Sequence, residues 1–598
     1  MRLSTDGDRD EARGLATMLR ALDEGVTWFD TAHAYGHDDG ELGHNERLLG
    51  RALATRPTAC VRVVTKCGMR RPGGLWEPDG RAATIRAQAK ASAVALGRPA
   101  DVLVLHAPDP KVSLATSIRA LLHAVDDGDA RAIGLSNVSR GQLDALASIT
   151  KDAPLAAVEV AVGAYDDTAA RGGVIAWCEE RGVPVLAYSP LGGPSRASRL
   201  ARDSVLQAIA RRHEATPGAI LIAYLLARSK AIVPLVGARR PESLSSALGA
   251  ERMALEVASI ATLDRRFPGL SLVRRPPRPP APNEATGEVV MIMGVAGAGK
   301  TRLAESYVAR GYERLNRDTL GGTLRGVAQK LEQRLSAGGS RFVLDNTYVT
   351  RASRSEVLRV AHGHGAVVRC VHVDASTPDL QLNCALRMLD RHGELLGGAE
   401  LTRRSRRDAN LFAPHTLYRM ERQLERPAED EGYASTETLP FVREHAGDRP
   451  AFVIPLDLLL EGTAAGDALS RAPALRTSAK LALARRPEGS ALLVYGFRPT
   501  ADDAWVRAAS SVVVAAALDG SSALVDVEIC THALGPPVCW CRPPLPGLWA
   551  AFSRRHGIDP RRSTLLAATP AHRAMAKALG VGDTPFVVSH AVGRSVVG

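Results

Sequence analysis

The chain has 598 residues, of which 45% are hydrophobic and 23% are charged, and its formal net charge is +12. It is too long for one ordinary core, so we expect roughly three to four domains. No apolar run approaches the roughly 18 residues that span a bilayer, and the N-terminal stretch MRLSTDGDRDEARG has no apolar signal-peptide core. These features exclude a membrane protein and predict a soluble, cytoplasmic one. The positive charge would help a polyanionic ligand approach, although a genomic bias towards arginine explains it equally well.

Residues 1–272 alternate short apolar runs with helical patterns rich in Ala, Leu and Arg. The runs are ACVRVVTK, DVLVLHAP, ARAIGLSN, LAAVEVAV, VPVLAYSP and AIVPLVGA. Strands and helices that alternate in this way are typical of a (β/α)8 TIM barrel. The stretch RRPPRPPAPNEATGE follows, and its prolines forbid a helix and favour an extended spacer. We therefore expect a barrel domain over residues 1–272 and a linker over residues 273–287.

Four polar residues lie at or just beyond the ends of predicted barrel strands. Asp30 and Tyr35 belong to GVTWFDTAHAYGHDDGELGHNERLLGRAL, Lys66 ends VRVVTK and His106 ends DVLVLH. With this spacing, most of residues 1–272 resembles the aldo-keto reductases, in which these four positions form the catalytic tetrad. The resemblance implies that Tyr35 protonates the carbonyl oxygen during hydride transfer. It also implies that Lys66, paired with Asp30, lowers the pKa of Tyr35 and that His106 orients the carbonyl.

The same resemblance implies an NADPH site. The stretch GLSNV places two residues where the family binds the nicotinamide carboxamide, a glutamate stands near the family's usual glutamine, and AYSPLGG supplies the residue that stacks on the nicotinamide ring. Two arginines in VGARRPESL suit the 2′-phosphate. In chain order these residues are Ser136, Asn137, Glu159, Tyr188, Arg239 and Arg240.

Two features of the barrel depart from the family's pattern. Ala247 stands where an asparagine usually follows the arginine pair, so we expect weaker adenine binding. The chain also begins where the family's first barrel strand has already ended. Either the true start lies upstream, which we favour, or the barrel lacks its first strand and has an open edge.

A second domain is predicted over residues 288–445. EVVMIMGVAGAGKTRLAESYVA combines a buried strand, a glycine-rich turn and a helix, and GVAGAGKT fits the phosphate-binding pattern G-x4-G-K-[ST]. Backbone N–H groups of such a loop face phosphates, the lysine reaches the β- and γ-phosphates, and the threonine holds Mg²⁺. The residues that we expect to bind ATP in this way are Gly294, Gly297, Gly299, Lys300 and Thr301.

The stretches that follow this loop, GYERLNRDTLGG and RFVLDNTYVTRASRSEVLRVAHGHG, resemble the kinase domain of polynucleotide kinases, within the zeta-toxin and AAA-type group of small P-loop kinases. The resemblance implies that Asp318 accepts the proton of a 5′-hydroxyl group. Asp345 would bind the Mg²⁺ shell or the acceptor, and Arg387, or alternatively Arg391, would face the transferred phosphoryl group. Close relatives of this loop phosphorylate small molecules, so a small-molecule acceptor stays open.

The third predicted domain covers residues 446–598 and contains ICTHALGPPVCWCRPPLPG. Cys530, His532, Cys539 and Cys541 offer three thiolates and one imidazole, a tetrahedral set that suits Zn²⁺. Metal explains these cysteines better than disulfides in a reducing cytoplasm, although another soft metal is an alternative.

The cysteine-containing stretch also resembles the zinc loop of haloacid-dehalogenase-like (HAD-like) phosphatases of the histidinol-phosphate and heptose-bisphosphate type. Pro455 replaces that family's nucleophile and leaves only Asp457, and Pro543 replaces its lysine. Ala568 and His572 replace two metal-binding aspartates. We therefore expect a catalytically inactive HAD-like Rossmannoid domain with a structural zinc ion.

The leading functional hypothesis is a bifunctional enzyme. The barrel would reduce a small carbonyl compound with NADPH, and the P-loop domain would use ATP and Mg²⁺ to phosphorylate a 5′-hydroxyl of DNA or RNA. One alternative gives the kinase a small-molecule acceptor. Another makes the barrel a non-catalytic sensor of nicotinamide nucleotide that regulates the kinase, although retention of all four tetrad residues argues against it.

Overall fold

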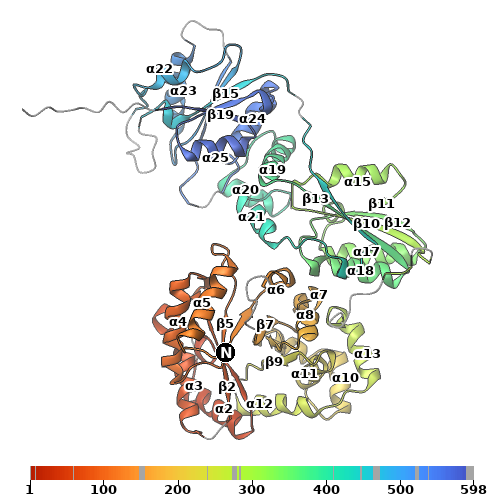
Figure 1. Cartoon of the computed structure of the whole chain (residues 1–598). Helices are drawn as coiled ribbons and strands as arrows, with labels where there is room; N and C mark the ends of the chain where they lie inside the picture. Colours follow the sequence, from red (N-terminus) through yellow and green to blue (C-terminus); the bar gives the residue numbers. More distant parts are fainter. Residues whose placement is uncertain are drawn as a thin grey trace, which may run out of the picture. The chain divides into compact units, whose positions relative to one another are not determined.

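The computed structural model describes residues 2–6, 9–57, 60–146, 155–238, 240–271, 279–281, 284–408, 410–444, 447–461, 472–518, 524–535 and 538–587 (Figure 1). The chain divides into two compact units. The first comprises Met1–Arg278, Thr350–Gly363 and Asp430–Gly432, and the second comprises Pro279–Val349, His364–Glu429 and Tyr433–Gly598. The predicted boundaries at 272–273 and 445–446 lie outside the described residues. Within the described ranges, no helix is both long enough and apolar enough to cross a membrane.

The first unit contains a curled sheet of parallel strands in sequential order, with helices outside it (Figure 1). Its strands are β1 (Trp28–Asp30), β2 (Arg62–Cys67), β5 (Val102–Leu105), β6 (Ile133–Ser136), β7 (Ala157–Ala161), β8 (Val185–Tyr188) and β9 (Ile232–Pro234). The inner strands β2, β5, β6, β7 and β8 are short apolar runs that are mostly buried on both faces, as parallel strands covered by helices must be. The part of the chain that the structure describes thus supplies seven strands of a TIM-barrel-like sheet, with β1 and β9 at its edges. Among the described residues, seven of the eight strands expected of a (β/α)8 barrel are therefore present.

Helices precede, connect and follow the strands of the first unit. They are α1 (Arg2–Thr5), α2 (Glu11–Asp23), α3 (His44–Ala54), α4 (Ala82–Leu96), α5 (Leu114–Asp126), α6 (Arg140–Leu146), α7 (Thr168–Arg171), α8 (Val174–Arg181), α9 (Pro194–Leu200), α10 (Ser204–Arg212), α11 (Pro217–Arg228), α12 (Pro241–Leu248), α13 (Val257–Arg266) and α14 (Pro268–Ser271). The helix α18 (Arg351–Gly363), which lies between β12 (Arg341–Asp345) and β13 (Ala366–Asp374) in the chain, is also grouped with this unit. A small hairpin, β3 (Met69–Arg70) with β4 (Glu77–Pro78), follows β2. Local sequence defines several helix ends: Ser113 caps the first turn of α5, and Gly97 ends α4 in the left-handed conformation.

The second unit begins with a five-stranded parallel sheet in the order β11-β12-β10-β13-β14. The strands are β10 (Gly287–Met293), β11 (Glu313–Arg314), β12 (Arg341–Asp345), β13 (Ala366–Asp374) and β14 (Ser435–Pro440). The helices are α15 (Lys300–Val308), α16 (Arg317–Leu320), α17 (Leu324–Ser336), α19 (Thr377–His392), α20 (Gly398–Ser405) and α21 (Pro414–Gln423). The central strand β10 runs into the glycine-rich loop and then into α15, which is the predicted strand–loop–helix order.

A second five-stranded parallel sheet completes this unit, in the order β17-β16-β15-β18-β19. The strands are β15 (Ala451–Pro455), β16 (Ala491–Phe497), β17 (Val525–Cys530), β18 (Thr564–Ala567) and β19 (Gly582–Pro585), and the helices are α22 (Ala479–Leu483), α23 (Asp503–Ala517), α24 (Gly547–His556) and α25 (Pro570–Leu579). The strand order reverses at β15, as in doubly wound sheets, which bind ligands beyond the strand ends at such a switch point.

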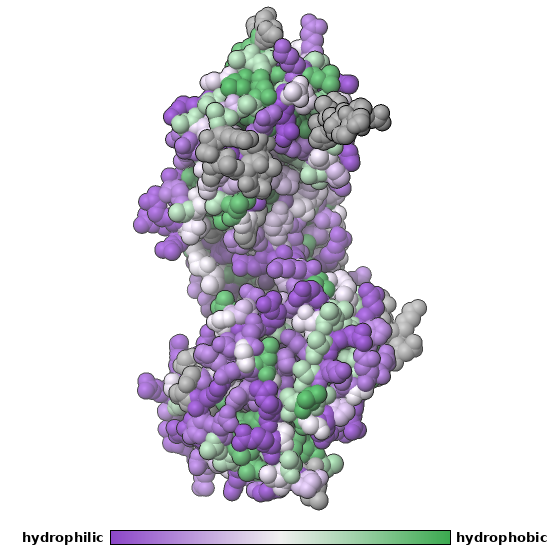
Figure 2. All heavy atoms as spheres, turned by 90° about the vertical axis from the view of Figure 1, so that its left-hand side faces the viewer, coloured by the Kyte–Doolittle hydropathy of each residue, from purple (hydrophilic) through white to green (hydrophobic). Residues whose placement is uncertain are grey.

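Hydrophilic residues predominate on the face of the molecule that Figure 2 draws, and hydrophobic residues lie among them in small groups. Scattered apolar residues of this kind are the normal condition of a protein surface.

Candidate functional site

The four residues of the predicted tetrad meet at the carboxyl ends of β1, β2 and β5. Lys66 Nζ donates hydrogen bonds to Asp30 Oδ1 and Oδ2 at 2.6 and 2.7 Å, and it lies 3.3 Å from the Tyr35 hydroxyl. The rings of Tyr35 and His106 meet edge to face, with their centroids 5.8 Å apart. The structure thus brings together all four side chains, although they come from three different strands and the loops after them.

Burial controls the protonation states of this cluster. It raises the pKa of Tyr35 above the ordinary value, although the nearby Lys66 ammonium group acts to lower it. It also disfavours the charge on Lys66, but the carboxyl groups of Asp30 and Glu159 outweigh this effect and raise the pKa of that amine. Burial, and then the charge on Lys66, lower the pKa of His106 to about 3. At neutral pH the cluster therefore presents a cationic lysine, a neutral tyrosine and a neutral histidine.

The residues predicted to face the nicotinamide also lie together. Ser136 and Glu159 are opposite each other in the β6–β7 ladder. Asn137 has a positive φ of 59°, which turns its side chain so that Nδ2 donates to the carbonyl of His106 at 2.9 Å. Tyr188 at the end of β8 donates to Asn137 Oδ1 at 2.7 Å. A short hydrogen-bonded chain thus connects His106 to Tyr188 through Asn137.

Glu159 is 2% exposed, and its Oε2 lies 3.2 Å from Lys66 Nζ. Burial, followed by the charge of Asp30, raises the pKa of Glu159 to about 8. The glutamate therefore belongs both to the tetrad's charge network and to the predicted nicotinamide site. The sequence pattern indicated only the second of these positions.

The structure describes only one of the two arginines that are predicted to contact the 2′-phosphate. Arg239 lies outside the described residues. Arg240 is exposed and directly precedes α12, where a guanidinium group is free to meet a phosphate from solvent. Ala247 is a buried residue of this same helix.

Sequence reasoning missed one side chain beside the tetrad. Trp76, in the loop between β3 and β4, lies with its ring centroid 6.2 Å from that of Tyr35 and 5.5 Å from that of His106. The indole is 48% exposed, and the guanidinium group of Arg71 lies 3.8 Å from its centroid. A half-exposed aromatic ring beside a proton donor is suited to cover an apolar part of a substrate. Its only signal in the sequence is a tryptophan in a glycine-rich loop.

The glycine-rich loop after β10 has the conformation that its sequence predicts. Gly294, Gly297 and Gly299 have φ values of 149°, 89° and 90°, which side chains rarely adopt. A Cβ atom at Gly297 would lie 2.7 Å from the carbonyl oxygen of Leu380, so glycine is also required for space. Lys300 Nζ donates to the carbonyls of Gly294 and Val295 at 3.0 and 2.9 Å.

Asp345, at the end of β12, lies beside this loop. Its carboxylate accepts a 3.4 Å hydrogen bond from Thr301 Oγ1, bonds of 2.9 and 2.6 Å from Arg314, and a 3.0 Å bond from Asn316. An acidic residue next to the P-loop threonine is the arrangement that P-loop enzymes use to hold Mg²⁺. Arg314 and Asn316 were not recognised in the sequence as parts of this site.

Asp318 lies two residues after Asn316 of the same network, in α16. Asn316 caps that helix through a 2.6 Å hydrogen bond from the Asp318 backbone N–H. The Asp318 side chain is 39% exposed, and its nearest ion-pair partner is Arg317 at 3.6 Å. A partly exposed carboxylate at this edge of the site is accessible to an acceptor hydroxyl group.

The structure separates the two candidate arginines of α19. Arg391 is bound by Asp408 at 2.7 Å, whereas Arg387 Nη1 donates to Asn410 Oδ1 at 3.1 Å. Burial, and secondly the charge of Arg387, lower the pKa of Lys300 to about 8, so Arg387 acts electrostatically on the phosphate loop. These contacts favour Arg387 over Arg391 as the residue that faces the phosphoryl group.

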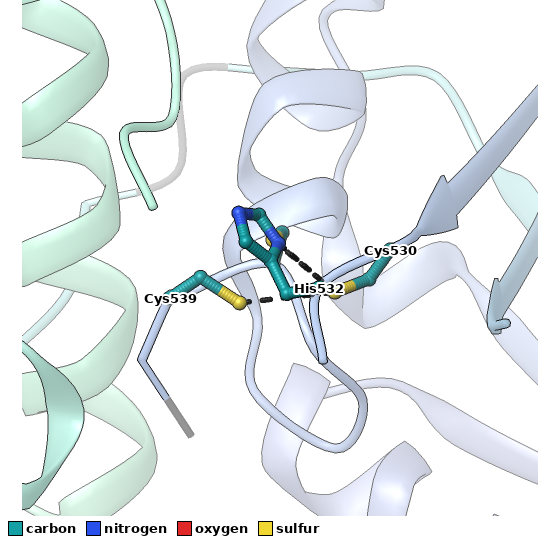
Figure 3. A group of neighbouring side chains, drawn as sticks. Cys530, His532 and Cys539 are labelled. Atoms are coloured by element: carbon teal, nitrogen blue, oxygen red, sulfur yellow. Dashed lines mark hydrogen bonds between the residues drawn. The ribbon is translucent and has the colours of Figure 1, made fainter. Parts of the chain in front are cut away.

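The four predicted metal ligands gather at the end of β17, and Figure 3 labels three of them, Cys530, His532 and Cys539. Their ligand atoms all lie within 4.8 Å of one another. Cys530 Sγ is 3.7 Å from Cys539 Sγ and 3.4 Å from Cys541 Sγ. His532 Nδ1 is 3.5 Å from Cys530 Sγ and 3.3 Å from Cys541 Sγ. Among the described residues, this is the only such cluster of His, Cys, Asp and Glu.

Residues at the positions compared with HAD-like motifs also lie together, at the carboxyl end of β15 in the sheet β17-β16-β15-β18-β19, here called the third sheet. Pro455 ends β15, and Asp457 follows it in a short 3-10 turn. His572 Nε2 lies 3.1 Å from Asp457 Oδ2, and its Nδ1 accepts a 3.2 Å hydrogen bond from the backbone N–H of Ala568. The carboxyl end of β15 therefore carries a histidine–aspartate pair rather than several carboxylates.

Comparisons with known proteins agree with the two family resemblances that the sequence shows over its first two predicted domains. Residues 1–266 match the aldo/keto reductase family, and residues 289–395 match an AAA domain. A 6-dehydroglucose reductase of Agrobacterium fabrum is 29% identical over 267 residues, covering 43% of this chain and 88% of that protein. A probable aldo-keto reductase of Glycine max is 25% identical over 268 residues, covering 40% and 75%. The solved glycerol dehydrogenase of Gluconobacter oxydans is 27% identical, covers 45% of this chain and 90% of its own, and has a TM-score of 0.39. The two family matches thus support an aldo/keto reductase domain over residues 1–266 and a kinase-like P-loop domain over residues 289–395.

Proposed function

We propose that the barrel reduces a small carbonyl compound and that the P-loop domain transfers a phosphoryl group from ATP to a 5′-hydroxyl of DNA or RNA. The contact of Lys66 with both Asp30 and the Tyr35 hydroxyl carries the first half of this proposal, because it pairs a buried proton donor with a fixed positive charge. The approach of Thr301 to Asp345 beside a glycine-rich phosphate loop carries the second half.

The residues at the barrel strand ends fit a nicotinamide cofactor. Glu159 is buried with its Oε2 3.2 Å from Lys66 Nζ, and Asn137 and Tyr188 offer further polar groups at the neighbouring strand ends. These side chains would hold NADPH, with Arg240 towards a 2′-phosphate. The bound cofactor supplies a hydride to a carbonyl carbon. Tyr35 donates the proton to the oxygen of that carbonyl, and Lys66 stabilises the phenolate that remains.

In the kinase domain, Lys300 and the glycine-rich backbone would bind the phosphates of ATP, and Thr301 with Asp345 would hold Mg²⁺. Asp318 accepts the proton of the attacking hydroxyl, and Arg387 neutralises charge on the transferred group. A polynucleotide acceptor follows from the resemblance of the Asn-Arg-Asp and Asp-Asn-Thr stretches, which surround Asp318 and Asp345, to polynucleotide kinases.

The third sheet fits an inactive HAD-like phosphatase domain with one structural zinc ion. Tetrahedral Zn²⁺ with Zn–S bonds of about 2.3 Å and Zn–N bonds of about 2.1 Å separates two sulfurs by about 3.8 Å and sulfur from nitrogen by about 3.6 Å. The sulfur separations here are 3.4 and 3.7 Å, and the sulfur–nitrogen separations are 3.3 and 3.5 Å. Bound zinc would crosslink the loop that carries these four ligands.

Phosphoryl transfer to an oligonucleotide tests the acceptor. The full chain is mixed with labelled ATP, Mg²⁺ and either a 5′-hydroxyl or a 5′-phosphorylated oligonucleotide of the same sequence. We expect label only on the 5′-hydroxyl strand and none with Asp318→Ala. If neither strand is labelled while ATP still binds, the acceptor is a small molecule.

Oxidation of NADPH by simple aldehydes tests the barrel. We expect turnover that Tyr35→Phe abolishes while NADPH still binds, as measured by cofactor fluorescence. Binding without turnover in the unaltered chain would instead make the barrel a sensor of nicotinamide nucleotide.

A further inference from the structure

The segments that carry the four metal ligands, residues 530–535 and 538–541 and here called the metal loop, contact the kinase domain within the second unit. Gly397, just before α20, forms an isolated β-bridge with Cys539. Gly398 donates its backbone N–H to the carbonyl of Val538 at 3.3 Å. A Cβ atom at Gly397 would overlap the imidazole of His532. The approach is therefore close enough to require a glycine on the kinase side.

Trp540, between two of the metal ligands, extends this contact. It is 1% exposed, and its indole Nε1 donates a 2.9 Å hydrogen bond to the carbonyl of Phe412. The two rings meet edge to face with centroids 6.1 Å apart. Trp540 also belongs to the hydrophobic core of the kinase, together with Leu396, Leu401 and Leu411. A residue of the metal loop therefore packs as part of the kinase core.

The segment that Trp540 contacts also forms a hydrogen bond with Arg387, the arginine assigned to phosphoryl transfer. Asn410, two residues before Phe412, accepts the 3.1 Å hydrogen bond from Arg387 Nη1. Arg387 in turn acts electrostatically on Lys300 of the phosphate loop. A continuous path thus runs from the metal ligands through Trp540, Phe412 and Asn410 to Arg387.

We propose that the metal loop is a positioning element of the kinase site: the bound metal orders Trp540, and Trp540 fixes the 410–412 segment, in which the Asn410 side chain accepts the hydrogen bond from Arg387. This inference rests on the proposed kinase function. Metal ligation orders short loops that their own hydrophobic contacts do not. Phosphoryl transfer depends mainly on positioning and charge neutralisation, so a small displacement of an arginine lowers kcat.

The test uses the full chain and compares Trp540→Phe with Trp505→Phe, which removes an indole N–H from the same domain away from the kinase. We expect Trp540→Phe to retain one metal ion per chain and its MgATP affinity, while kcat for phosphoryl transfer falls about tenfold. Trp505→Phe should leave metal content, MgATP affinity and kcat for phosphoryl transfer unchanged. Barrel turnover serves as an internal control and should not change in either variant.

A double-mutant cycle separates positioning from general damage. If Trp540 acts through Arg387, adding Trp540→Phe to Arg387→Ala should lower kcat no further. If the double variant instead loses kcat by the product of the two single-variant factors, the inference is overturned. An unchanged kcat in Trp540→Phe alone would also overturn it.

Hydrogen exchange provides a readout that does not need an acceptor. Removal of the metal by a chelator should increase amide exchange in residues 396–408 and 410–412 and leave β10 unchanged. Gly397→Ala, which keeps all four ligands, should have the same effect, whereas Gly326→Ala in α17 has space for its new methyl group and should not. Unchanged exchange after proven metal loss would overturn the inference. If the chain labels no acceptor but shows the exchange response, the proposed acceptor is wrong and the coupling stands.

Discussion

Lys66 Nζ and Glu159 Oε2 lie 3.2 Å apart, and the lysine ammonium group stands between the carboxyl groups of Asp30 and Glu159. The family resemblance places a glutamine at or near the position of Glu159, and a glutamine would add no charge. The buried ammonium group of Lys66 is thus paired with two acidic groups. Whether Glu159 is protonated determines how much negative charge surrounds Tyr35.

The first prediction concerns stability against pH. The pKa of Glu159 is raised by burial to about 8, above the ordinary value of 4.5, so between these values the folded chain holds a proton that the unfolded chain has lost. Stability is therefore greatest below about pH 4.5 for this group and falls as pH rises towards 8. Each tenfold change in proton affinity is worth about 1.4 kcal/mol.

Glu159→Gln should remove this pH dependence, because the amide does not ionise. We expect the barrel of the variant to melt at a higher temperature than the unaltered chain at pH 8, with the difference shrinking towards pH 5. Calorimetry at several pH values measures this difference in melting temperature. If the melting temperatures of the two chains differ by the same amount at every pH in this range, the raised pKa of Glu159 is contradicted.

The second prediction concerns His106. Burial and the charge on Lys66 hold its pKa at about 3, so the imidazole is neutral across the working range. We expect kcat/KM for carbonyl reduction to show no acidic limb near pH 6.5, the ordinary histidine value. An inflection near pH 6.5 that disappears in His106→Gln would show that the imidazole titrates there.

Motif spacing predicted the tetrad and the phosphate loop because both depend on residues close in sequence to strand ends. Parallel strands then bring those ends together, as Asp30, Lys66 and His106 show. The positions of Trp76 and Trp540 depend instead on how loops pack against distant elements, and no local pattern encodes that. Strand alternation likewise indicated α/β domains, whereas the order β17-β16-β15-β18-β19 comes from long-range pairing.

The third prediction concerns Asp345, which is 2% exposed and bound by Arg314 and Asn316. Asp345→Asn removes the charge that pairs with Arg314 and that would attract Mg²⁺. We expect MgATP affinity to fall at least about tenfold and the kinase domain to lose about 1–3 kcal/mol of stability. Titration calorimetry with and without Mg²⁺ measures the first effect. Asp318→Ala is the matched control, since it should abolish transfer but leave MgATP affinity unchanged.

The last prediction concerns the metal ligands. Cys539→Ser should lower metal content from one ion per chain to almost none and destabilise the third sheet, because ligation free energy contributes directly to folding. Trp540 lies in the kinase core, so we also expect the kinase domain to melt at a lower temperature while the barrel transition stays in place. Metal analysis and calorimetry of the full chain separate these effects. Cys60→Ser changes an exposed cysteine of the barrel and serves as the control. Retained metal with normal melting of Cys539→Ser would mean that the four residues are not a structural metal site.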